Sequence, residues 1–435
     1  MSDQSQAFLA NASLAVSNAA ISPGDRDILR SLAERMAAMA ARPGEALKRK
    51  LWTAHNDLQR TRPLVFCDPE NGWNEIIRED DIKCRGELAR NWEMTLRKEV
   101  FWGESMGDDR IVEPVFDVAH VREDSDWGMH ERKIGGGQGG SYTWEAPLKN
   151  YDQMDQLRFP VITVDRQATD HLIGLARSIF GNLLKVRLRT RWWWTLGMTW
   201  TLVNLRGLEQ IMFDMMDHPE ELKQLMAFLR DGHLAKLDFL ESNGLLAANH
   251  DGTYVGSGGF GYTRQLPQER FDPERIRTRD MWGFCESQET VGVSPEMFAE
   301  FVYPYQVPIL KRFGLNCYGC CEPLDKRWPI IKDAPALRRV SVSPWAELKT
   351  MAGQLEDKFI FSYKPSPSDL AMPKMDEDLV RSKIRRALEV TRGCHLEMIM
   401  KDNHTLGNNP SNATRWCRIA REEIERAHGS EGERV

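Results

Sequence analysis

The stretch Leu396-Glu397-Met398-Ile399-Met400 is a short, mostly apolar run that is followed at once by polar side chains. Its length suits a buried strand, because strands in globular proteins span about three to ten residues. Comparable runs occur at residues 64–66, 245–248, 281–284, 315–318, 340–342 and 359–361. Each of these runs is predicted to be a strand.

Helical patterns lie between the apolar runs. After Pro219, leucine and methionine residues recur at helical spacing, and Ser294-Pro295 has the residue types of a helix N-cap and first turn. Short strands separated by helices predict a parallel sheet that is buried on both faces. The number of repeats favours a closed (β/α)8 TIM barrel, with an open doubly wound sheet as the alternative. No Gly-x-Gly-x-x-Gly follows a strand, so a dinucleotide site is not predicted.

The chain is expected to divide into an N-terminal helical extension, residues 1–60, and a barrel, residues 61–430. Ile28, Leu29, Leu32 and Met36 recur at helical spacing within the extension. The glycine run 135–140 lacks the Lys-Ser/Thr ending of a phosphate-binding loop and is predicted to be a loop or flap.

Composition favours a soluble cytoplasmic protein. The 64 acidic residues exceed the 58 basic ones, for a net charge of −6, which argues against a nucleic-acid partner. No run of eighteen apolar residues is present, and the first twenty residues lack the basic start of a signal peptide. The eight cysteines have no framework spacing, which indicates reduced thiols.

Functional groups in a (β/α) barrel project from the carboxyl ends of the strands. Thiol, imidazole and carboxylate groups follow several of the predicted strands, and these are the ligand types of a catalytic zinc. The candidates are Glu286, Cys320 or its neighbour Cys321, and His404, while Asp251 is a candidate for lining a substrate site. Cys317, Cys394 and Cys417 are expected to be buried, residues 192–194 to be core tryptophans, and Arg187, Arg189 and Arg191 to lie on a solvated strand face.

Several motifs resemble the uroporphyrinogen decarboxylase-like superfamily over residues 160–425. They are Thr195-Leu196-Gly197-Met198-Thr199-Trp200, Leu205-Arg206-Gly207-Leu208-Glu209, Asp217-His218-Pro219-Glu220, Ser294-Pro295-Glu296-Met297-Phe298 and Tyr303-Pro304-Tyr305. The resemblance implies a (β/α)8 barrel. True decarboxylases carry an N-terminal Arg-rich signature, which residues 62–67 lack.

The other branch of that superfamily contains cobalamin-dependent methyltransferases, which bind zinc through a His-x-Cys pair and a ligand at the last strand. Tyr318-Gly319-Cys320 resembles that pair with Tyr in place of His, and His404 lies near the last ligand position. The resemblance therefore implies a zinc-dependent methyltransferase with Glu286, Cys320 and His404 as ligands. Asp251, Tyr254 and His404 are the expected catalytic residues.

The expected reaction moves a methyl group between a small methylated substrate, such as a methoxylated compound or a thiol, and a corrinoid (cobalamin) held by a partner protein. The chain lacks an Asp-x-His-x-x-Gly corrinoid motif, so it is not expected to hold the corrinoid itself. The alternatives are a metal-free decarboxylase acting on a tetrapyrrole or another carboxylated substrate, and a non-catalytic corrinoid-binding module. A homodimer is expected from the resemblance.

Overall fold

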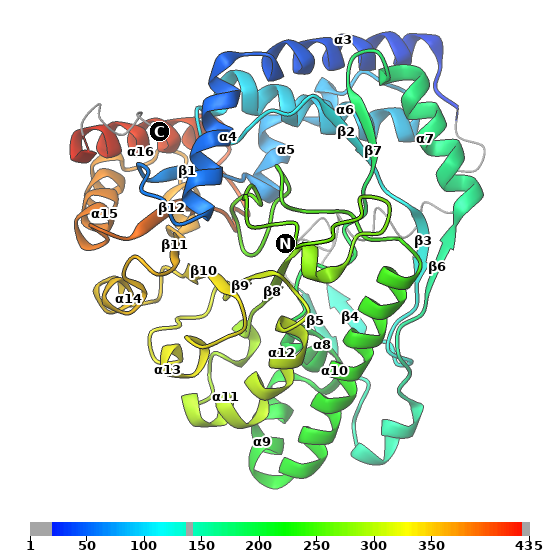
Figure 1. Cartoon of the computed structure of the whole chain (residues 1–435), viewed down its shortest axis with the longest axis vertical. Helices are drawn as coiled ribbons and strands as arrows, with labels where there is room; N and C mark the ends of the chain where they lie inside the picture. Colours follow the sequence, from blue (N-terminus) through cyan, green and yellow to red (C-terminus); the bar gives the residue numbers. More distant parts are fainter. Residues whose placement is uncertain (1–19, 136–141, 429–435) are drawn as a thin grey trace.

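In the computed structural model, which describes residues 20–135 and 142–428, six parallel strands form one sheet (Figure 1). Its order is β1 (Leu64–Cys67), β12 (His395–Met400), β11 (Ile360–Tyr363), β10 (Leu337–Val342), β9 (Leu315–Tyr318) and β8 (Trp282–Cys285). Apart from the first two residues of β10, all of their residues are buried. The parallel sheet that the apolar runs predict is therefore confirmed.

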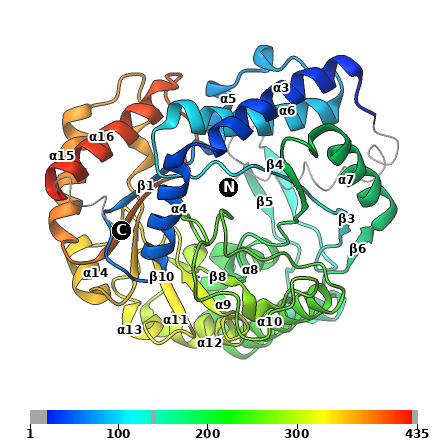
Figure 2. The same ribbon diagram turned by 45° about the horizontal axis from the view of Figure 1, so that its top comes forward.

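Helices lie on the outer side of this sheet (Figure 2). Those that connect strands β8 to β12 are α11 (Pro295–Phe301), α12 (Tyr303–Leu310), α13 (Trp328–Ile331), α14 (Leu348–Leu355) and α15 (Glu377–Val390), and α16 (Ser411–His428) follows the last strand. The predicted cap of α11 is confirmed, because the Ser294 hydroxyl accepts a hydrogen bond from the Met297 amide at 3.2 Å.

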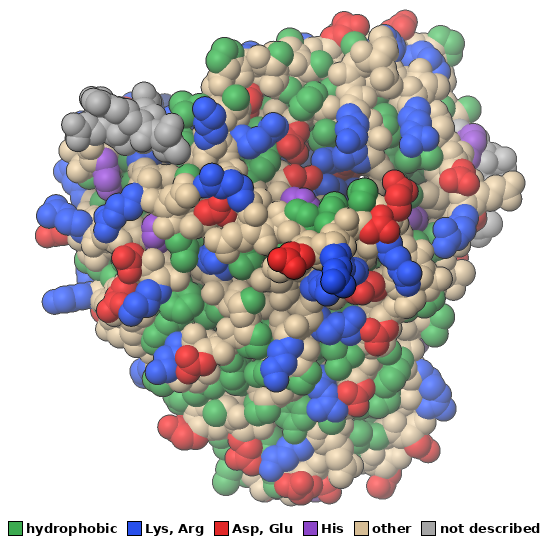
Figure 3. All heavy atoms as spheres, in the orientation of Figure 1, with side chains coloured by type: hydrophobic (Ala, Val, Ile, Leu, Met, Phe, Trp, Pro, Cys, Tyr) green, Lys and Arg blue, Asp and Glu red, His purple; other side chains and the backbone are tan. Residues whose placement is uncertain are grey.

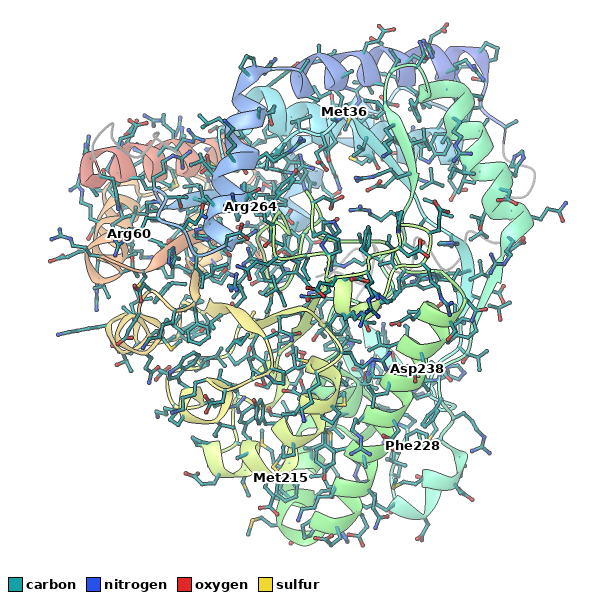
Figure 4. The ribbon with its side chains drawn as sticks, viewed as in Figure 1. Met36, Arg60, Met215, Phe228, Asp238 and Arg264 are labelled. Atoms are coloured by element: carbon teal, nitrogen blue, oxygen red, sulfur yellow. The ribbon has the colours of Figure 1, made fainter. Side chains whose placement is uncertain are left out.

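The other side of the molecule is built from pairs of short strands and longer helices. The strands are β2 (Val115–Val118) with β7 (Lys185–Leu188), β3 (Val121–Asp124) with β6 (Ile162–Asp165), and β4 (Arg132–Gly135) with β5 (Tyr142–Glu145). The helices are α6 (Glu87–Phe101), α7 (Arg166–Phe180), α8 (Thr199–Arg206), α9 (Leu208–Asp217) and α10 (Pro219–Ser242). Met215 of α9 and Phe228 of α10 belong to the main apolar core (Figure 4).

The described residues form a mixed α/β fold with an open six-stranded sheet, and they do not show the closed barrel of eight strands. The strand predicted at residues 245–248 is wrong, since this segment has no strand. Its two leucines are buried in a loop, and the Leu245 carbonyl accepts a hydrogen bond from the Trp192 indole at 2.9 Å. In a strand, this carbonyl would accept a hydrogen bond from a neighbouring strand, but here it accepts one from the indole.

Two helices cover residues 23–56 of the segment predicted to be helical. α3 (Pro23–Ala40) packs on α6 and α7 through an apolar cluster that includes Met36 (Figure 4). α4 (Pro43–Asn56) ends at the sheet, where its last two side chains are buried. The shorter helical segments are η1 (Glu70–Gly72), α5 (Trp73–Ile76), η2 (Glu79–Asp81), η3 (Trp102–Met106), η5 (Tyr151–Gln156), η6 (Thr278–Asp280), η7 (Gln288–Thr290) and η8 (Pro367–Asp369).

Acidic and basic side chains are intermixed over the face drawn in Figure 3. Within residues 20–135 and 142–428, no helix is both long enough and apolar enough to span a membrane. The predicted glycine loop lies, after Gly135, outside the described residues.

Candidate active site

Cys320 follows β9 at the carboxyl edge of the sheet. Gly319 between them has a φ of +88°, and a Cβ at this glycine would lie 2.5 Å from Cδ1 of Leu324. Glycine is required there because other residues rarely adopt this backbone conformation and because no space exists for a side chain. This turn directs the Cys320 thiol into the interior, where the residue is only 3 % exposed.

Three polar groups surround the sulfur of Cys320. The Ser257 hydroxyl donates to it at 3.1 Å, the Cys321 sulfur lies 3.6 Å away, and the Lys401 ammonium lies 3.8 Å away. The Cys321 thiol and the Lys401 charge lower the pKa of Cys320, although burial opposes them. The pKa of Cys321 is raised, so Cys320 is the thiol of the pair that loses its proton more readily.

Lys401 is a buried cation at the end of β12. Burial alone lowers its pKa, but the neighbouring Cys320 and Asp402 raise it well above the ordinary value. Its ammonium lies 2.6 Å from Oδ1 of Asp402, and Cys321 lies 3.5 Å from Oδ2 of the same carboxylate. Lys401 therefore remains charged beside the sulfur.

Glu286 follows β8 and is fully buried. Its Oε2 accepts a hydrogen bond from the Gln288 amide at 2.8 Å, whereas its Oε1 has no hydrogen-bond partner. Burial and the carboxylates of Glu289 and Glu322 raise its pKa well above the ordinary value. A protonated carboxyl is a hydrogen-bond donor, and it must lose its proton before it can bind a metal.

The structure does not bring the predicted metal ligands together. His404 is exposed, and its Nδ1 lies 3.4 Å from the side-chain amide of Asn71 rather than near Cys320. Tyr318, which the motif has in place of His, is buried and donates to Oε1 of Gln306 at 2.6 Å. Among the described residues, no three His, Cys, Asp or Glu side chains are grouped so as to hold a metal ion.

Asp251 is engaged in ion pairs. Arg189 contacts both of its carboxylate oxygens, at 2.9 and 2.7 Å, and Arg187 contacts one at 3.1 Å. Although burial opposes it, the pairing with Arg189 lowers the pKa of Asp251 to about 2. The prediction of a solvated strand face is therefore wrong for Arg187 and Arg189, which are half-buried and paired with Asp251, whereas Arg191 is exposed.

Tyr254 lies in the wall of a cavity of about 170 Å³. Trp193 and Trp194 are half-buried in the same wall, so the prediction that residues 192–194 are all core tryptophans holds only for Trp192. Trp194 and Phe284 of this wall pack in one apolar cluster with Cys320, which does not itself line the cavity.

Sequence patterns did not identify Ser257 and Arg191 as site residues. Ser257 lies in a loop rich in positive-φ glycines, where no periodic pattern marks a side chain that turns inward. Arg191 follows β7 by three residues and lines the cavity. Lys401 could have been predicted as a site residue, because it directly follows the last strand and functional groups project from the carboxyl ends of strands.

No protein-family model and no curated protein matches the chain. A solved structure, a methyltransferase from Methanosarcina mazei, is similar at a TM-score of 0.47 with 11% sequence identity. The similarity covers 87% of this chain and 98% of that one. A likeness this distant carries no information about activity.

Proposed function

We propose that this chain is a methyltransferase and that the buried thiolate of Cys320 is its reacting group. The observation that carries the proposal is the Cys320 sulfur held between the Ser257 hydroxyl and the Lys401 ammonium. A cation within a few ångströms keeps a thiolate anionic at neutral pH, and thiolates are strong nucleophiles toward carbon. The resemblance of residues 195–209 and 294–305 to a superfamily that contains methyltransferases supports the choice of a methyl group.

In the proposed step, the Cys320 sulfur attacks the methyl carbon of a small methylated substrate. The sulfur–carbon bond forms as the bond from carbon to the substrate heteroatom breaks, and the electron pair leaves on that heteroatom. Lys401 lies where it can stabilise negative charge on either side of the transfer. A corrinoid carried by a partner protein is the proposed onward acceptor. In its reduced Co(I) state it would supply the electron pair for the new bond to the methyl carbon, and Cys320 would keep the electron pair of the broken sulfur–carbon bond as thiolate.

Zinc is a further element of the proposal, expected from the sequence resemblance. Cys320 and Cys321 are suitable zinc ligands by chemistry, but the exposed His404 and Glu286, whose pKa is raised by burial, do not complete a ligand set with them. The proposed attack on the methyl carbon therefore uses side chains alone.

The test uses the full chain, its Cys320→Ser variant and the matched Cys321→Ser variant. Methyl transfer from a panel of methyl ethers, methyl thioethers and methylamines to cob(I)alamin is followed by formation of methylcobalamin. We expect transfer that Cys320→Ser abolishes and that Cys321→Ser largely retains. Metal analysis of the same samples tests the zinc prediction, with about one zinc per chain, lost in Cys320→Ser, as the expected sign of a ligand role. Equal transfer by Cys320→Ser and wild type, or no transfer from any member of the panel, would contradict the proposal.

A further inference from the structure

Two neighbouring cysteines follow β9, and their sulfurs lie close together. The Sγ atoms of Cys320 and Cys321 are 3.6 Å apart. Both residues lie in a bend outside the helices and strands, so a small rearrangement that brings the sulfurs together breaks no hydrogen-bond ladder. The third cysteine of this segment, Cys317, lies within β9, and its sulfur lies 3.7 Å from the Arg339 guanidinium.

The thiols of Cys320 and Cys321 have opposite neighbours. The sulfur of Cys320 has donors beside it, the Ser257 hydroxyl at 3.1 Å and the Lys401 ammonium at 3.8 Å. The Cys321 thiol instead donates to Oδ2 of Asp402 at 3.5 Å. A cation favours the thiolate at Cys320, whereas a carboxylate keeps the proton on Cys321 and can accept it later. This arrangement places a nucleophilic sulfur next to a second thiol that is able to react after it.

The two thiols also differ in their exposure. Cys320 is buried beneath the loop, whereas Cys321 is half-buried and reaches solvent. A thiolate with a resolving thiol beside it is typical of cysteines that peroxides oxidise reversibly. Hydrogen peroxide is only slightly larger than water, so a small opening of the loop at Cys321 admits it to the Cys320 sulfur.

We infer that Cys320 and Cys321 form a dithiol modification site, which hydrogen peroxide converts to a disulfide and which dithiol reductants restore. That this disulfide also stops methyl transfer rests on the proposed function, because it removes the nucleophilic sulfur. The formation of the disulfide does not depend on that function.

The oxidation takes place in two steps. In the first, the Cys320 thiolate attacks one oxygen of the peroxide. The sulfur–oxygen bond forms as the oxygen–oxygen bond breaks, and the departing hydroxide takes the electron pair and then a proton from solvent. In the second, Cys321 gives its proton to Asp402 and attacks the Cys320 sulfur. The disulfide forms as the sulfur–oxygen bond breaks, and the hydroxide that leaves takes the proton from Asp402. The two cysteines lose two electrons, which reduce one peroxide to two waters.

A disulfide between adjacent residues is easily reduced. Their Cα atoms are about 3.8 Å apart across a trans peptide bond, which is less than the separation of about 4.4–6.8 Å in ordinary disulfides. The resulting strain makes the bond labile. Cys321 therefore protects Cys320, because a labile disulfide is restored by reductants whereas oxidation beyond the sulfenic acid is irreversible.

The first experiment exposes the full chain to hydrogen peroxide, unfolds it and alkylates the remaining thiols. Mass spectrometry then reads the tryptic peptide 313–326, which contains Cys317, Cys320 and Cys321. We expect Cys320 and Cys321 to be protected from alkylation and Cys317 to be alkylated, and dithiothreitol to restore all three thiols. Free Cys320 and Cys321 after exposure, or a bond from Cys320 to Cys317, would overturn the inference.

The second experiment tests the role of Cys321 as the resolving thiol. Cys321→Ser is compared with Cys394→Ser, which removes another half-buried thiol, one that donates to the Ala352 carbonyl at 3.8 Å. After the same exposure, dimedone, which reacts with sulfenic acids, should label Cys320 at least about tenfold more in Cys321→Ser than in Cys394→Ser. Circular dichroism checks that both variants are folded.

Equal labelling of Cys320 in the two folded variants would refute the role of Cys321. Neither experiment measures turnover, so its result is independent of methyl transfer. A chain that forms the disulfide but transfers no methyl group from the substrate panel would contradict the proposed function and leave the modification site supported.

Discussion

The middle of the six-stranded sheet and its carboxyl edge each hold a fully buried glutamate, and the two glutamates differ in their partners. In the middle, the Arg339 guanidinium lies 3.0 Å from one oxygen of Glu397, and Nε2 of His55 lies 3.1 Å from the other. At the carboxyl edge, Glu286 has no cation in contact within the described chain, and its Oε1 has no hydrogen-bond partner. The ion pairs of Glu397 join the strands to α4, whereas the unpartnered oxygen of Glu286 is available to a ligand.

The pKa values express the same difference. Despite complete burial, Arg339 and His55 lower the pKa of Glu397 to about 2, so it is ionised. Burial and neighbouring acids raise the pKa of Glu286 well above its ordinary value. The pKa values of these two fully buried glutamates are thus shifted in opposite directions, because only one of them has a cation beside it.

The largest expected effect is on activity at the carboxyl edge. Cys320→Ser should lower the rate of methyl transfer about 10³-fold or more, because a serine hydroxyl remains protonated at neutral pH and is a poor nucleophile. The midpoint of urea unfolding should change little. A variant that loses transfer and is also strongly destabilised would instead assign Cys320 to the core.

The next effect is on stability in the middle of the sheet. Arg339→Met leaves Glu397 buried without its main cation, and it should lower the free energy of unfolding by about 3–5 kcal/mol. Urea denaturation measures this change, with Arg312→Met as a surface control expected to lose less than about 1 kcal/mol. If both variants lose the same amount, the ion pair within the sheet has no special role.

A smaller effect is expected on the protonation of Cys320. Lys401→Met removes the buried cation, so the pKa of Cys320 should rise and less thiolate should be present at pH 7. The ultraviolet absorbance of the thiolate against pH, with Cys320→Ser as the blank, measures this pKa. An unchanged titration would mean that Ser257 and Cys321 stabilise the thiolate without Lys401.

Sequence patterns correctly predicted the strands in which the apolar residues of a run are buried by neighbouring strands and helices. The runs at residues 315–318 and 396–400 are buried on both faces, so hydrophobicity alone marks them as strands. The run at residues 245–248 is as apolar but lies in a loop, because its partner is an indole rather than a strand. Predicting this difference requires knowledge of Trp192, which is far away along the chain.

The sequence allowed single residues of the candidate site to be predicted, but it did not show which of them lie together. The strand-end rule selects Cys320, Glu286 and Lys401, since it depends only on where a strand stops. It also selects His404, but this residue lies four residues beyond the end of β12 and is exposed. Which of these side chains meet depends on loop geometry such as the turn at Gly319, and no periodicity encodes that geometry.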